Sequence, residues 1–131
     1  MISGVATALL LLVAAPSAAD LSWLIDAEIP ARIAAAQAEA VRLDAKAAES
    51  DRLRKEVLAR RQAALDEKAV LEPTLPSLSR GKRGDAEKRL AELGGIADSQ
   101  ATRAQQLQAE VSAYRSAAQA QRAFAAAADG T

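Results

Sequence analysis

The stretch that decides the fold is residues 86–128, AEKRLAELGGIADSQATRAQQLQAEVSAYRSAAQAQRAFAAAA. Two rows of residues recur in it at seven-residue spacing. One row is Ala86, Leu93, Gln100, Leu107, Tyr114, Gln121 and Ala128, and the other is Leu90, Ala97, Ala104, Val111, Ala118 and Ala125. Alternating steps of three and four residues lie on one face of a helix. The pattern predicts one long helix with a narrow seam of small residues, which is typical of a close-packed coiled coil.

The composition predicts a thin helical protein. The chain has 131 residues, enough for one domain, and 50% of them are hydrophobic although only 2% are aromatic. Roughly a quarter of the residues are alanine. Alanine favours helix and lets helices approach closely, but it buries little area, so a thick core cannot form.

The residue types present argue against catalysis. There are 17 basic and 17 acidic residues, so no net charge attracts nucleic acid. The chain has no Cys and no His, which removes the thiol nucleophile, the commonest general base and the commonest metal ligands. The glycines near residue 81 lack the spacing of a phosphate-binding loop. We expect no enzyme activity, no cofactor, no metal and no nucleic-acid partner.

Residues 20–72 form the first expected helical arm. Ile29-Pro30-Ala31 suits a helix start, because proline is tolerated in the first turn. The apolar stripe then keeps a helical period through Ile29, Ile33, Ala36, Ala40, Leu43, Ala47 and Ser50. Beyond Ser50, three basic residues fall where this register requires apolar groups: Arg54, Arg61 and Lys68. We therefore expect the seam of this arm to drift, with the basic stems lying over it.

Residues 73–84 form the expected connector, and residues 85–131 the second arm. Pro73 and Pro76 should stop the first helix, and Asp85 is the expected N-cap of the second. The arms have similar lengths, which favours an antiparallel helical hairpin over an extended rod. Gly94-Gly95 either permits close helix contact or acts as a hinge; because both rows pass through it in phase, we expect a continuous helix.

Charged residues spaced four apart should support both helices. The expected ion pairs are Glu28–Arg32, Asp51–Lys55, Glu56–Arg60, Asp85–Arg89 and Lys88–Glu92. A separate cluster, Arg80, Lys82 and Arg83, places three positive charges within four residues of the connector. These three residues are the candidate contact for an anionic partner, and the alternative is a solvated turn.

Residues 1–19 resemble a secretory signal peptide. An apolar run over residues 5–15 is followed by Ser17 and Ala19, small residues at the positions that precede a cut. The first four residues contain no Lys or Arg, which departs from that pattern. The alternatives are an uncleaved membrane anchor over residues 2–25, with Trp23 at the interface, and a buried helix of a soluble complex.

These observations predict an all-α chain: a long antiparallel helical hairpin or coiled coil with an alanine-rich seam, associated with itself or with a larger assembly. The expected function is that of a non-enzymatic structural or adaptor component of a periplasmic, envelope-associated or secreted assembly. One alternative is a coiled coil anchored in the inner membrane and facing the periplasm. In layout, though in no motif, that alternative is similar to phage inner-membrane spanin subunits and cell-envelope tethers. Another alternative is a helical periplasmic chaperone.

Overall fold

The protein is built from two long helices and a short connection. The computed structural model describes the backbone of residues 18–130 and the side chains of residues 28–130. The elements are α2 (Ala18–Leu71), a short 3-10 helix η1 (Glu72–Ser77) and α3 (Arg80–Asp129). The described backbone contains no strand, so the all-α prediction is confirmed. The expected signal peptide up to Ser17 and the side chain of Trp23 lie outside the described residues.

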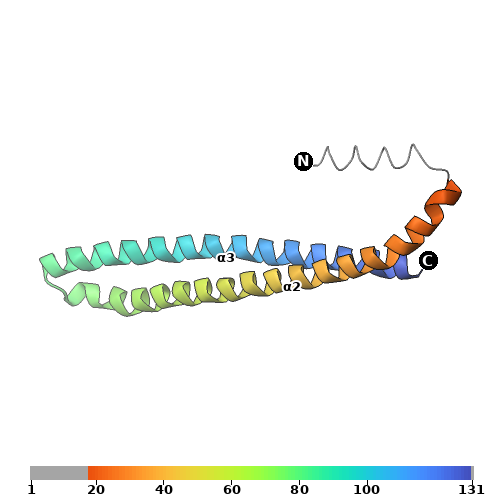
Figure 1. Cartoon of the computed structure of the whole chain (residues 1–131). Coiled ribbons are helices and arrows are strands. Elements are labelled where there is room, and N and C mark those ends of the chain that lie inside the picture. The colour runs from red at the N-terminus through yellow and green to blue at the C-terminus, as the bar shows by residue number, and fades with distance from the viewer. Residues whose placement is uncertain (1–17, 131) are drawn as a thin grey trace. The chain divides into compact units, whose positions relative to one another are not determined.

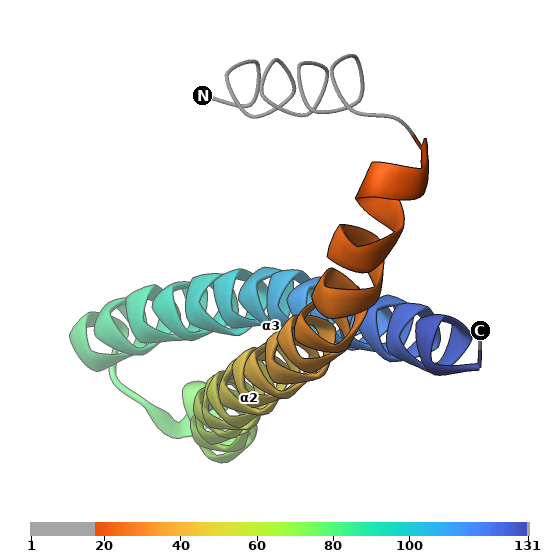
Figure 2. The same cartoon turned by 45° about the vertical axis from the view of Figure 1, so that its right-hand side comes forward.

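The contacts divide the chain into two units. The turn unit comprises residues 41–119, and the terminal unit comprises the described residues 18–40 and 120–130. In the turn unit, α2 and α3 run side by side in opposite directions, and η1 connects them (Figures 1 and 2). This part of the chain is therefore a helical hairpin, as the matched arms predict, and the extended rod does not form there.

The buried face of α3 follows the two predicted rows. Every residue of both rows is buried or half-buried. The buried members are Ala86, Leu93, Ala97, Ala104, Leu107, Val111, Ala118 and Ala125. The helix is continuous through Gly94-Gly95, as expected. Close contact with α2 does not explain these glycines, because a Cβ atom added to either would meet no atom within 4 Å.

The predicted drift of the α2 seam is wrong. The seven-residue spacing continues beyond Ser50, and Arg54, Arg61 and Lys68 are half-buried at the positions of one row. That row is Ala40, Ala47, Arg54, Arg61 and Lys68, and the second row is Ala36, Leu43, Ser50, Val57, Ala64 and Leu71. Long basic side chains can occupy such positions, because their apolar stems can be buried while their charged ends reach solvent.

The seam contains few large side chains. Among the described residues, the largest that are almost completely buried are Leu93, Leu107 and Val111. Near the middle of the turn unit, Val57 packs with Ala104 and Leu107, and Leu53 covers this cluster from one side. Each alanine in the seam removes little apolar surface from water, so the contact depends on the summed area of many small residues.

The start of α2 differs from the prediction. Pro30 lies inside the helix, which begins at Ala18, instead of in its first turn. Proline removes one backbone hydrogen bond but has a helical φ, so a helix can continue through it at a cost of about 3 kcal/mol. The predicted Glu28–Arg32 ion pair forms across this position, with a nitrogen–oxygen distance of 3.1 Å.

The connector is shorter than predicted. α2 ends at Leu71, directly before the segment containing Pro73 and Pro76, as expected. α3 begins at Arg80 instead of Asp85, and the backbone N–H of Arg83 donates to the Ser79 carbonyl at 2.7 Å. Serine is favoured before a first helical turn, and the described glycines have no positive φ, so Gly81 and Gly84 join the helix.

Replacing Leu107 by Asp tests the seam. Leu107 is 1% exposed, so this change removes a packed side chain and buries a carboxyl group. We expect Leu107→Asp to lower the free energy of unfolding by about 3–5 kcal/mol, with loss of helicity by circular dichroism. Gln106→Asp is the matched control at an exposed neighbouring position and should change stability by less than about 1 kcal/mol. Unchanged helicity and size of Leu107→Asp would show that this row is not a seam.

Candidate functional site

The predicted basic cluster lies in the first turn of α3. Arg80, Lys82 and Arg83 are all exposed there, so the structure brings them together on a helix end instead of a loop. The Nε of Arg83 donates to the Leu75 carbonyl of η1 at 3.2 Å, so this side chain also fixes the connection. Positive side chains at a helix N-terminus repel the positive end of its dipole. The cluster is therefore a site of concentrated positive charge, open to solvent.

Polar contacts between α2 and α3 lie on one side of the seam in the turn unit. Arg89 of α3 binds Glu67 of α2 through two hydrogen bonds of 3.1 and 2.8 Å. The Nζ of Lys46 lies 5.8 Å from the ring centre of Tyr114. We call this side the polar edge. It consists of the residues of the turn unit that directly precede the Ala40–Lys68 row of α2 or the Leu90–Ala125 row of α3, namely Lys46, Leu53, Arg60, Glu67, Arg89, Ile96, Arg103, Glu110 and Ala117.

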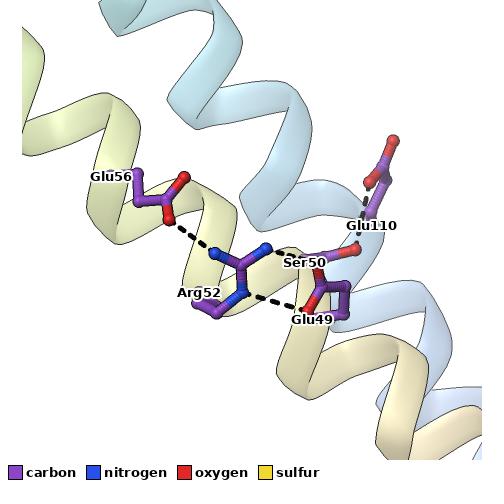
Figure 3. Close-up of polar contacts among 5 residues, drawn as sticks. All are labelled: Glu49, Ser50, Arg52, Glu56 and Glu110. Atoms are coloured by element: carbon purple, nitrogen blue, oxygen red, sulfur yellow. Dashed lines mark hydrogen bonds and ion pairs between the residues drawn. The ribbon is translucent and has the colours of Figure 1, made fainter.

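A buried hydroxyl joins this edge to the seam. Ser50 is 7% exposed and is the buried polar residue among those described. Its hydroxyl donates to the carboxylate of Glu110 on α3 at 3.2 Å (Figure 3). A single polar group in a helix seam favours the register in which its hydrogen bond forms. Ser50 and Glu110 thus align α2 with α3.

Next to this contact, α2 carries an ion network along its surface (Figure 3). Arg52 binds Glu49 through two hydrogen bonds of 3.1 and 2.6 Å, and it also pairs with Glu56. The hydrogen bond from Arg52 lowers the pKa of the Glu49 carboxyl and raises the pKa of Arg52. Arg54 and Lys55 lower the pKa of Asp51 in the same way, mainly through hydrogen bonds.

The helix ion pairs agree with the prediction in part. Glu28–Arg32 and Asp51–Lys55 form, the latter at 3.3 Å. The other three predicted pairs, Glu56–Arg60, Asp85–Arg89 and Lys88–Glu92, are replaced by different contacts. Glu56 binds Arg52, and Arg89 binds both Glu67 and Glu92. Glu67 lies on the opposite helix. Its hydrogen bond with Arg89 is the main reason that the pKa of Arg89 is raised. The contact between Arg89 and Glu67 could not be predicted from local spacing, because it depends on how the two helices align.

The terminal unit contains an open cavity of about 420 Å³. Its lining residues are Gln37, Arg122, Ala125, Ala126 and Asp129. Within the described part of the chain, no three His, Cys, Asp or Glu side chains are grouped to hold a metal ion. No helix among these residues is both long enough and apolar enough to cross a membrane.

Comparisons with protein-family models, with curated proteins and with solved structures find no match for this chain. The candidate site is therefore defined by its own geometry: a polar edge that aligns two helices, an ion network on α2 and a basic end at the start of α3.

The lowered carboxyl pKa values predict a loss of stability in acid. A carboxylate whose pKa is lower in the folded chain stabilises it above the ordinary pKa, and this contribution disappears as pH falls through the folded value. We expect the melting temperature to decrease as the pH is lowered below about 4. Replacing Arg52 by Gln should reduce this fall, because Glu49 loses the partner that lowers its pKa.

Thermal unfolding followed by circular dichroism between neutral and acidic pH measures this effect. Arg103→Gln is the control, since Arg103 is an exposed arginine of α3 outside the Arg52 network. An acid dependence that is the same in both variants would show that the Arg52 network does not contribute.

Proposed function

We propose that this protein is a non-enzymatic structural or adaptor component of a periplasmic, envelope-associated or secreted assembly, and that its two long helices act as a coiled coil. One observation carries this proposal. Both helices bury a stripe with seven-residue spacing. Apart from Arg54, Arg61 and Lys68, which occupy seam positions of α2, the charged groups described above lie along the exposed faces or at the edge of that stripe. Such a surface recognises other helices by shape and register, and does not require reacting groups.

The composition of the seam supports self-association. The hairpin relies on alanine and on three almost completely buried larger side chains, Leu93, Leu107 and Val111. In addition, Arg61 places a buried Nε atom without a hydrogen-bond partner beside this seam. An unsatisfied buried donor lowers stability. A thin hairpin with these features is marginal by itself, and association with a second copy or with a larger assembly would bury further area.

We further propose that the basic cluster at the start of α3 contacts an anionic surface. Arg80 and Lys82 are exposed, and the helix N-terminus adds partial positive charge beside them. Electrostatic attraction of this kind is worth about 1 kcal/mol for each basic residue near an anionic membrane. The end of the hairpin that carries the turn would then be the contact point.

The compartment and the association are tested together by recovering the protein from a Gram-negative host. We expect a periplasmic species whose intact mass begins at Asp20, and whose sedimentation mass exceeds one chain. Its melting temperature should rise with protein concentration, because dilution favours dissociation. A membrane-bound species that retains Met1 would instead support the anchored coiled coil, and a single-chain mass with a constant melting temperature would contradict self-association.

The anionic contact is tested with vesicles that contain phosphatidylglycerol. We expect Arg80→Glu/Lys82→Glu to reduce co-sedimentation with these vesicles at least about tenfold, since two attractive charges become repulsive. Arg60→Glu/Arg103→Glu is the matched control, because it changes the net charge equally on the polar edge. Equal losses in both double variants would contradict a local contact at the start of α3.

A further inference from the structure

The turn of the hairpin carries apolar side chains that are open to solvent. We call residues 70–83, at the end of the turn unit where α2 leads through η1 into α3, the tip (Figure 1). Val70 in the last turn of α2 is 73% exposed. Leu75 in η1 and Leu78 directly after it are half-buried, and η1 contains no buried residue. The tip therefore presents apolar surface that the hairpin itself does not cover.

Positive charge surrounds this apolar surface. Residues 68–85 contain four basic residues and two acidic ones. One of the acidic residues, Glu72, already lies beside Lys68, with a nitrogen–oxygen distance of 3.7 Å. Arg80 and Lys82 are exposed, and neither forms an ion pair within the described part of the chain. Their two positive charges are therefore available to an anionic partner.

Hydrogen bonds within the tip satisfy several of its polar groups. The Thr74 hydroxyl donates to the Leu71 carbonyl at 2.6 Å, and the Ser77 hydroxyl donates to the Thr74 carbonyl at 2.8 Å. The Leu75 carbonyl accepts from the Nε of Arg83 at 3.2 Å, which also keeps a basic side chain beside η1. The two prolines of η1 have no backbone N–H. Polar groups that already have partners cost less to remove from water, so these contacts suit the tip to a less polar surrounding.

We propose that the tip binds the surface of an anionic lipid bilayer and that Val70, Leu75 and Leu78 enter the boundary between headgroups and acyl chains. Arg80 and Lys82 lie at the lipid phosphates. This boundary offers apolar contact and negative charge side by side, which is the combination that the tip presents. A soluble polyanion offers charge alone and leaves the apolar residues in water. The inference rests on the proposed anionic contact, and it assigns the partner and the residues that enter it.

Two exposed valines of α2 provide a matched test. Val70 in the tip is 73% exposed, and Val41, many turns away on the same helix, is 65% exposed. We expect Val70→Ser to reduce co-sedimentation with phosphatidylglycerol vesicles about fivefold, because it removes apolar surface that enters the bilayer. Val41→Ser should bind like the unsubstituted chain, and both variants should keep their helicity by circular dichroism. Equal binding of the two variants would overturn the entry of Val70, while a loss in Arg80→Glu/Lys82→Glu would leave the anionic contact standing.

A polarity-sensitive fluorophore reports entry into the bilayer directly. The chain has no Cys, so Val70→Cys or Val41→Cys carries the label at a single position. With phosphatidylglycerol vesicles, we expect the label at Val70→Cys to emit at shorter wavelength and to be quenched by brominated lipids, and the label at Val41→Cys to be unchanged. Vesicle binding without these changes would overturn the entry and keep the anionic contact. Binding to polyphosphate but not to vesicles would overturn the lipid partner, and binding to neither would overturn the anionic contact as well.

Discussion

The packing of small residues between α2 and α3 is the constraint on which the rest of this protein depends. Alanine at most of the buried seam positions allows two helix backbones to approach closely over many turns. Each such contact buries little area, so no small group of residues holds the helices together. The buried area comes from the length of the helices instead of from large side chains. This explains why helices of 54 and 50 residues contain so few large buried side chains.

A seam in which most of the buried residues are alanine has few side chains that fix its alignment. The structure supplies that information through polar groups. Ser50 with Glu110 and Glu67 with Arg89 can pair in one register, because a shift by one helical turn would separate each donor from its acceptor. Arg54, Arg61 and Lys68 add basic stems to one row of α2, which distinguishes its two rows. The buried apolar area thus stabilises the contact between α2 and α3, and the polar groups determine the register in which the two helices align.

The sequence by itself determined the helical class, the hairpin and the α3 seam, because these depend on local periodicity and on where proline interrupts it. The rows that include Leu93, Leu107 and Val111 are buried as their spacing predicts, and α2 ends before Pro73. The tertiary structure decided the features that depend on the opposite helix. Arg54 and Arg61 are half-buried at seam positions of α2, although their charge suggested a drift. Arg89 binds Glu67 because antiparallel alignment brings together residues 22 positions apart, which no local spacing rule describes.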